Sequence, residues 1–405
     1  MVACAAPATR VDVRAHVDLA PEPPVDLRIV LQPEHARDAE RYVQAASSAV
    51  RECAKALGRF EARELTLADP AWHGPMLGSD AIALDRVPWW TTVMSMAPEL
   101  ATARGVSRRC WTKAFDASGL PPWFVDGLAE FTARRAVVPI FEGLANPPGY
   151  AILEQRYFGG FVPRVVRIRL MAETDGAPVS AYRAHAAVDV APQSPSAADS
   201  EALAGKTVLA LGTLERWVGR PVFDAIVAEF VRASKGRAPR LADFERVASD
   251  VSGQELSWFF DQAFRASRAF DYGVEGLASE PDASGAFVTT VTARRYGEAR
   301  FTGASGTRTG GFDNGRGITL RVTFADGQRR TDWWDGRDER RAFRYQSPAR
   351  AVSATIDPDR VLLLDLDRTN NSRTLAPKQG AAATRWASLY LLWLEHLLLS
   401  YASLA

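Results

Sequence analysis

Apolar and polar positions along this chain follow two different periods, and the change from one to the other falls near residue 270. Residues 9–31 indicate one or two short strands joined through a proline-rich turn. Residues 35–57 carry apolar side chains three and four positions apart, which predicts a helix, and Gly58 is typical of the residue that follows a helix end. Further short strands are expected at 63–68 and 80–84.

Between about residues 89 and 267 the apolar period is 3.6 wherever a period can be found, which predicts an α-rich region. The clearest helix lies in VFDAIVAEFVRASKG, whose apolar side chains form one stripe and whose last residue, Gly236, is a natural stop. Residues 186–203 are polar and rich in Pro and Ser, so we expect a surface loop there. Further helices are expected at 206–218, 241–250 and 254–266.

Beyond residue 270 the period is two, as in GITLRVTFADGQRR, where Asp326-Gly327 supplies a hairpin turn. This alternation predicts a small antiparallel β-sandwich of roughly 100 residues. Its strands are expected at 272–278, 286–294, 318–324, 329–334, 351–356 and 361–366.

The final segment, WASLYLLWLEHLLLSYASLA, predicts a strongly apolar helix. Glu395 and His396 fall in its middle, which makes a full membrane span costly. Ser388 and Glu395 lie on one side and leave only a narrow polar strip. Two interpretations stay open: residues 386–404 contact a membrane or a partner, or they pack on the chain's own domains.

Composition and charge add a few limits. The 405 residues, 47% hydrophobic and 24% charged, are typical of a globular protein of two or three domains. With 49 basic and 48 acidic side chains the net charge is +1, so we expect no nucleic-acid partner. Cys4, Cys53 and Cys110 form neither a CxxC metal pair nor a disulfide framework. No secretory signal is recognisable, and a cytoplasmic and a membrane-associated location both remain open.

Two short segments carry the candidate chemistry, PELAT at 98–102 and PWFVDGLAEF at 122–131. They resemble the HELAH-like helix and the WLxEGxAEY-like segment of the gluzincin aminopeptidases, the family of membrane alanyl aminopeptidase and leukotriene hydrolase. The matching positions are Glu99, Leu100 and Ala101 in the first segment and Trp123, Gly127, Ala129 and Glu130 in the second. The resemblance covers about residues 28–270.

The resemblance and the periodicity together predict an α+β multidomain fold. Residues 1–30 would be the remnant of an N-terminal β domain, and residues 31–270 a degenerate catalytic-fold domain, a thermolysin-like mixed lobe with an α-helical bundle. Residues 271–375 would form the β-sandwich, and residues 376–405 the C-terminal apolar helix.

The family chemistry requires two His at i and i+4, which bind one zinc ion together with a Glu that follows about eighteen residues later. Pro98 and Thr102 stand at the two His positions, and neither offers a nitrogen or sulfur donor. Asp126 stands at the Glu position, one methylene shorter and five residues later than usual. Ala204, two residues before Lys206, stands where the family has its catalytic Tyr. The residues therefore do not support the family's zinc cofactor.

The surviving carboxylates have two interpretations each. Glu99 is either a relic general base or a solvated or salt-bridged side chain. Asp126 is either a vestigial ligand or part of a packing segment. Trp123 and Glu130 are candidates for lining a cleft, although their aromatic and apolar neighbours suit a core.

The histidines offer no family-type pair. They are His16, His35, His73, His185 and His396. No two of them lie within four residues of each other, so the chain has no HExxH helix. His73 could join Asp80 or Asp126 in a metal site unrelated to the family, and Cys110 could be a nucleophile, but it lacks a nearby His partner.

These observations favour a catalytically inactive relative of the zinc aminopeptidases, a pseudo-peptidase that binds a peptide, a protein partner or a membrane component. One alternative is an active metallopeptidase with a non-standard ligand set such as Glu99, Asp126 and His73. Another is an accessory protein of a membrane assembly, attached through residues 386–404.

Overall fold

The computed structural model describes residues 10–69, 81–85, 97–142, 182, 197–303 and 317–376, with the isolated residues 380, 383, 387 and 390. The chain forms two compact units. Unit 1 comprises Met1–Ala177, Val227–Pro239 and Trp386–Ala405, and unit 2 comprises Pro178–Ile226 and Arg240–Arg385. The domain boundaries expected from the sequence stay a prediction.

Unit 1 begins with a four-stranded sheet of order β1-β2-β3-β4, which confirms the strands expected in this part of the chain. The strands are β1 (Val11–Leu19), β2 (Glu22–Leu31), β3 (Glu64–Ala68) and β4 (Ile82–Ala83). β1 and β2 are antiparallel, whereas β3 pairs in parallel with both β2 and β4. The N-terminal strands therefore share one sheet with β3.

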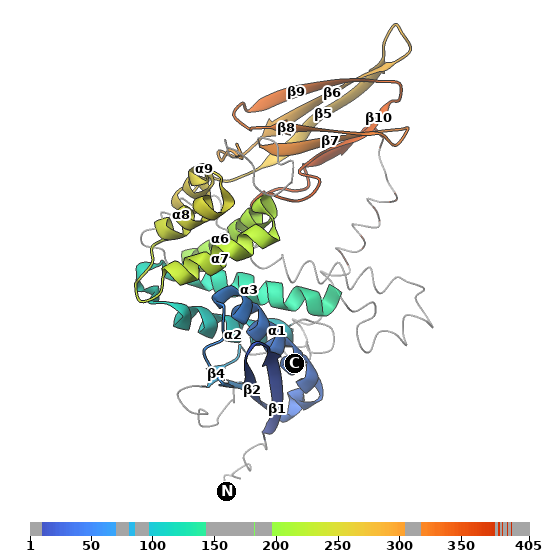
Figure 1. The fold of residues 1–405 in the computed structure, drawn as a ribbon. Helices are drawn as coiled ribbons and strands as arrows, with labels where there is room; N and C mark the ends of the chain where they lie inside the picture. Colours follow the sequence, from blue (N-terminus) through green and yellow to red (C-terminus); the bar gives the residue numbers. More distant parts are fainter. Residues whose placement is uncertain are drawn as a thin grey trace, which may run out of the picture. The chain divides into compact units, whose positions relative to one another are not determined.

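One side of this sheet is covered by α1 (Ala39–Leu57), which follows a 3-10 turn, η1 (Pro33–Asp38) (Figure 1). Tyr42, Ala46 and Val50 lie on its buried face and pack with the inward side chains of β2 in one apolar core. Gly58 ends the helix with φ of 74°, a left-handed conformation that favours glycine, as the sequence predicts.

Two longer helices complete the ordered part of unit 1. They are α2 (Ala97–Ala114) and α3 (Pro122–Glu142), with a short 3-10 turn at Ala117–Gly119 between them. Both pack against α1 and against each other (Figure 1). Pro98 lies in the first turn of α2, where a missing N–H costs no helical hydrogen bond, so this proline is compatible with the helix.

The helical part of unit 2 contains α6 (Ala197–Val218), the first half of α7 (Arg220–Ala233), α8 (Leu241–Ser252) and α9 (Ser257–Phe260), which continues into a π-helical turn at Asp261–Arg265. The helices expected from periodicity are therefore present. The loop expected over 186–203 is wrong for its last part, because α6 already begins at Ala197, and Ala202 and Leu203 are buried.

The C-terminal part of unit 2 is the expected antiparallel sandwich, with two sheets of order β11-β10-β7-β8 and β5-β6-β9 (Figure 1). Ile318, Leu320, Val322 and Phe324 on β7 are all buried, as their alternation predicts. The strands are β5 (Tyr272–Pro281), β6 (Phe287–Arg295), β7 (Ile318–Phe324), β8 (Arg329–Trp334), β9 (Arg340–Ser347), β10 (Ala351–Ile356) and β11 (Ser372–Thr374).

The strand expected at 361–366 is wrong, and side chains explain why. The Asp357 carboxylate accepts the backbone N–H groups of Val361 and Leu362, at 2.8 and 2.9 Å. The Thr213 hydroxyl accepts the next N–H, from Leu363, at 3.0 Å. The backbone donors are taken by side chains, so this apolar run forms turns and makes only a single bridge between Phe270 and Asp365.

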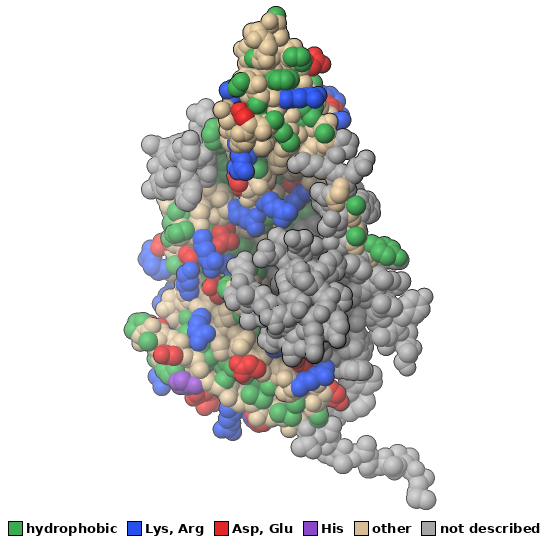
Figure 2. All heavy atoms as spheres, turned by 90° about the vertical axis from the view of Figure 1, so that its right-hand side faces the viewer, with side chains coloured by type: hydrophobic (Ala, Val, Ile, Leu, Met, Phe, Trp, Pro, Cys, Tyr) green, Lys and Arg blue, Asp and Glu red, His purple; other side chains and the backbone are tan. Residues whose placement is uncertain are grey.

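The apolar tail, residues 386–404, lies outside the described residues apart from two isolated positions, so its contact with a membrane or partner stays a prediction. Among the helices that the structure describes, none has the length and hydropathy needed to cross a bilayer. On the face shown in Figure 2, basic and acidic side chains of the described residues lie intermixed, in keeping with the balanced net charge.

Candidate functional site

The first two turns of α2 hold the two positions that the resemblance assigns to zinc-binding histidines. The Thr102 hydroxyl donates a hydrogen bond of 2.7 Å to the carbonyl of Pro98, one helical turn earlier. Both residues are buried, and Thr102 has no exposed surface. The Thr102 side chain therefore bonds to the Pro98 backbone within the helix, and its hydroxyl proton is used in that hydrogen bond.

Between these positions, Glu99 is buried, with 2% of its surface exposed. Arg41 on α1 binds it with two hydrogen bonds, Nε to Oε1 at 2.6 Å and Nη2 to Oε2 at 2.8 Å. This is the bidentate geometry that makes arginine–carboxylate pairs strong and directional. Of the two interpretations of Glu99, the structure places it in an ion pair that ties α2 to α1.

The other carboxylates of the predicted site lie on α3 and are also paired with arginines. Asp126 lies 3.5 Å from Arg108 of α2, and both side chains are about half exposed. Glu130 binds Arg104 of α2 through both of its oxygens and accepts a hydrogen bond from Nε of a second arginine, Arg134, at 2.7 Å. Glu130 therefore receives two guanidinium groups at once.

These pairs fix the register of the two helices. Arg104 pairs with Glu130, and Arg108, four residues later on α2, pairs with Asp126, four residues earlier on α3. The two helices therefore run antiparallel. Asp126 thus lies opposite Arg108, six residues beyond Thr102, which is about 9 Å along the helix axis. The structure does not bring Asp126 to the turn that holds Pro98 and Thr102.

The charge state of Glu130 follows from its surroundings. Burial alone would raise the pKa of this carboxyl group. The hydrogen bond from Arg104 and the charges of Arg104 and Arg134 outweigh burial and hold the pKa below its ordinary value. Glu130 is therefore an ionised partner of two arginines, and its place in a cleft stays a prediction.

The remaining candidates are distributed as follows. Trp123 is 3% exposed and packs edge-to-face on Phe124, with ring centroids 6.1 Å apart. Cys110 is buried beside Cys53, and burial raises the pKa of its thiol well above the usual value, which disfavours a nucleophile. His73 and Asp80 lie outside the described residues, so the metal site suggested for them stays a prediction.

The position of the family's tyrosine lies in unit 2. Ala204 on α6 presents only a methyl group there. Lys206, two residues on, is buried and donates a hydrogen bond of 2.9 Å to the carbonyl of Ala266, the residue after the π-helical turn. Burial lowers the pKa of Lys206 to about 8. Lys206 therefore caps the end of the π-helical turn at Ala266.

Sequence reasoning missed the arginines that neutralise these carboxylates. Arg104 and Arg108 are spaced by four residues, as are Asp126 and Glu130, and this matched spacing was the available signal for two facing helices. Arg41 is separated from Glu99 by 58 residues, and nothing in the local sequence connects them.

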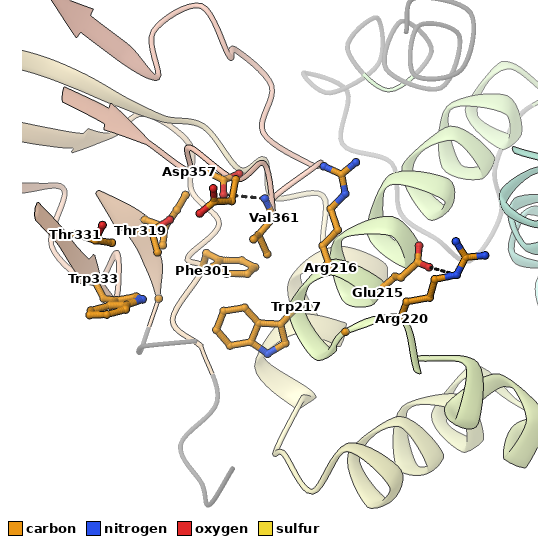
Figure 3. A pocket seen from close by; sticks show the side chains of 14 residues that line it. Glu215, Arg216, Trp217, Arg220, Phe301, Thr319, Thr331, Trp333, Asp357 and Val361 are labelled. Carbon is orange, nitrogen blue, oxygen red and sulfur yellow. Dashed lines mark hydrogen bonds and ion pairs between the residues drawn. The ribbon is translucent and has the colours of Figure 1, made fainter. Parts of the chain in front are cut away.

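Unit 2 also contains a cavity of about 710 Å³ that the sequence did not predict (Figure 3). Trp217, at the end of α6, and Phe301 form one wall, with ring centroids 5.1 Å apart and edge-to-face. Trp333 of β8 forms the opposite end, and its ring faces the same space (Figure 3). A volume of this size lies in the range typical of ligand-binding pockets.

The cavity lies on the outer face of the β7–β8 hairpin. Thr319 pairs with Trp333 across the two strands, and Thr331 stands two residues from Trp333 on the same face. The turn after β10 closes another side with Asp357 and Val361. Burial raises the pKa of Asp357, although the backbone N–H groups that it accepts counteract this.

Comparisons with known proteins bear on the fold. No protein-family model and no curated protein matches the chain. A solved structure, the crystal structure of Legionella pneumophila aminopeptidase A in complex with aspartic acid, is similar to it with a TM-score of 0.50 and 14% sequence identity. The match covers 88% of this chain but only 38% of that aminopeptidase, so the chain spans well under half of its length. The fold is aminopeptidase-like.

At 14% identity the likeness concerns the fold alone, and membership of the gluzincin family stays a prediction. The residues at the predicted ligand positions do not fit zinc, because Pro98 has no side-chain donor and the Thr102 hydroxyl is bonded to the backbone. Within the described part of the chain, no three His, Cys, Asp or Glu side chains gather closely enough to hold a metal ion.

Proposed function

We propose that this chain is a catalytically inactive relative of the zinc aminopeptidases that serves as a binding or scaffold protein for a peptide or protein partner. The observation that carries the proposal is the hydrogen bond from the Thr102 hydroxyl to the Pro98 carbonyl. Side chains at i and i+4 can hold one cation only if both present a donor to the same point. Here the Thr102 side chain bonds to the backbone of Pro98, and the Pro98 side chain has no donor atom for a metal ion.

The carboxylates support the same proposal. A general base must accept a proton from a water molecule or substrate within hydrogen-bond reach. Both oxygens of Glu99 instead accept hydrogen bonds from Arg41. Glu130 is likewise directed at Arg104 and Arg134. Charges that peptidase chemistry would direct at a metal and a water are directed at guanidinium groups.

A binding role is supported by the cavity in unit 2. It combines aromatic walls, from Trp217, Phe301 and Trp333, with hydroxyl and charged groups at its margins. Pockets of this composition commonly bind ligands by apolar contact and use a few polar groups for orientation. The cavity therefore supports a binding role for this fold, and function must be argued from such a site, not from the fold.

The test is elemental analysis of the purified full chain after dialysis against zinc, run beside hydrolysis of a panel of aminoacyl reporter substrates. We expect far less than one zinc per chain and no hydrolysis above the buffer rate. Stoichiometric zinc together with hydrolysis that a chelator abolishes would overturn the proposal.

Two variants separate a true activity from a contaminating host peptidase. Glu99→Gln and Asp126→Asn would both reduce activity if these carboxylates served an altered metal site, the alternative reading of the sequence. Activity that is equal in the native chain and in both variants comes from elsewhere and leaves the proposal intact.

A further inference from the structure

We propose that the outer edge of β8 and the adjoining cavity form a binding site for an extended peptide with a large apolar side chain and an acidic residue. This site deepens the proposed function, on which it rests, because it names the class of partner. The peptide would add to the sheet as a further strand beside β8, a mode in which the backbone supplies affinity and alternate side chains supply specificity.

The outer edge of β8 pairs with no other described strand. Among the strands that the structure describes, the sheet has the order β11-β10-β7-β8, so within this part of the chain β8 has a neighbour on one side only. Phe324 N–H donates to the Gln328 carbonyl, and antiparallel ladders alternate between bonded and non-bonded pairs. The bonded residues on β8 are therefore 330, 332 and 334, and the backbone groups of 329, 331 and 333 point outward.

A second contact supports this assignment. Thr319 is the partner of Trp333 across the two strands. Its carbonyl accepts a hydrogen bond from the N–H of Asp357, on the side away from β8. The Thr319–Trp333 pair is thus a non-bonded pair, as the alternation requires. Among the described residues, the outward N–H groups of Thr331 and Trp333 have no hydrogen-bond partner in the fold.

The side chains of the same residues define what the peptide must carry. Trp333 and Thr331 line the cavity, so a side chain of the added strand that lies beside Trp333 enters it (Figure 3). Trp217 is held in place by a hydrogen bond of 2.9 Å from its Nε1 to Gln254, and it forms a fixed aromatic wall. The aromatic lining and the volume of about 710 Å³ suit Phe, Tyr, Trp or Leu.

Charge fixes the second feature of the peptide. Arg329 lies four residues from Trp333 on the same face, is exposed, and forms no ion pair within the described structure. Arg216 also lines the cavity, where its charge acts on Asp357, and it donates one N–H to the Arg360 carbonyl at 2.6 Å. An acidic residue four positions from the apolar anchor would meet Arg329.

The experiment uses the full chain and a fluorescein-labelled nine-residue peptide, with Phe and Glu four residues apart in a Thr/Ser/Val background, and fluorescence anisotropy as the readout. Thr331→Pro removes an outward N–H without cutting the bonds to β7, because proline is tolerated on the open side of an edge strand. Thr331→Ala keeps that N–H and is the matched control. We expect the proline variant to weaken binding at least about tenfold and the alanine variant to change it less than about threefold.

Two further variants test the side chains. Trp333→Ala should weaken binding at least about tenfold, whereas Tyr296→Ala, which removes an exposed aromatic ring outside the cavity, should leave it unchanged. Arg329→Ala should weaken binding of the Glu peptide about three- to fivefold and not affect a Gln peptide. Circular dichroism and thermal melts confirm that each variant is folded.

Equal binding by Thr331→Pro and Thr331→Ala would overturn strand addition, and undetectable binding of the peptide to the folded native chain would overturn the site itself. Either failure leaves the proposed loss of catalysis standing. Zinc-dependent hydrolysis in the metal and reporter assays would instead overturn that loss and leave a measured binding constant at β8 unchanged.

Discussion

The ion pair between Arg41 and Glu99 offers the sharpest test of how unit 1 is held together. Arg41→Met removes the guanidinium but keeps much of the apolar stem, so a carboxylate with 2% exposure loses its bidentate partner. Breaking a buried pair from one side costs about 3–5 kcal/mol. The Arg41 side chain is 24% exposed, so water reaches part of the site and we expect about 2–4 kcal/mol.

The double variant Arg41→Met/Glu99→Leu provides the comparison. Replacement of both partners removes the uncompensated charge, so the double variant should recover most of the lost stability and lie within about 1–2 kcal/mol of the native chain. Urea unfolding followed by far-ultraviolet circular dichroism measures all members of the cycle, including Glu99→Leu alone.

Two results would refute this reasoning. A loss below about 0.5 kcal/mol for Arg41→Met would mean that the pair is a solvated contact of the ordinary surface kind. A double variant that is as unstable as Arg41→Met alone would mean that the two side chains are not coupled, and that Arg41 acts through another contact.

Two buried ionisable groups give further predictions. The hydrogen bond that His35 Nδ1 donates to the Asp69 carboxylate, opposed by burial, raises the pKa of His35. The stability that this pair contributes is therefore present below about pH 6.5 and is lost as pH rises through the raised folded value. Thermal melts between pH 5 and 8.5 should show the difference between the native chain and His35→Gln shrinking with pH; a constant difference contradicts this. Burial lowers the pKa of Lys206 to about 8, so the folded state is penalised progressively as pH falls from about 10.5 to 8. Lys206→Met should therefore be more stable than the native chain by about 1–2 kcal/mol at pH 7, after loss of the bond to Ala266, and this gain should fade above pH 8 in urea titrations.

Periodicity predicted much of the fold because burial imposes it directly. The alternation of Ile318, Leu320, Val322 and Phe324 corresponds to one buried face of β7, and the helical spacing in 35–57 corresponds to the core face of α1. β9 was missed because most of its exposed positions carry arginine, including Arg341 on the side of Phe343, so only Phe343 and Tyr345 give an apolar signal.

The wrong strand prediction arose because a side chain competes with a neighbouring strand for backbone N–H groups. The run at 361–366 is apolar enough for a strand, but Asp357 takes two of its N–H groups. At the candidate site, residue identity alone revealed that Pro98 and Thr102 cannot serve as histidines do. The partner of Glu99 could not be predicted, because Arg41 comes from another helix and the pairing exists only once α1 and α2 have packed.

The arginine–carboxylate pairs among α1, α2 and α3 have a consequence for the conditions under which these helices stay associated. A cation held by imidazoles is released by chelators and in mild acid, where the ligands take up protons. Arginine keeps its charge at every pH a cell reaches. The contacts of Arg41, Arg104 and Arg134 with their carboxylates thus need no metal ion and keep their charges where a metal site would be lost to acid or a chelator.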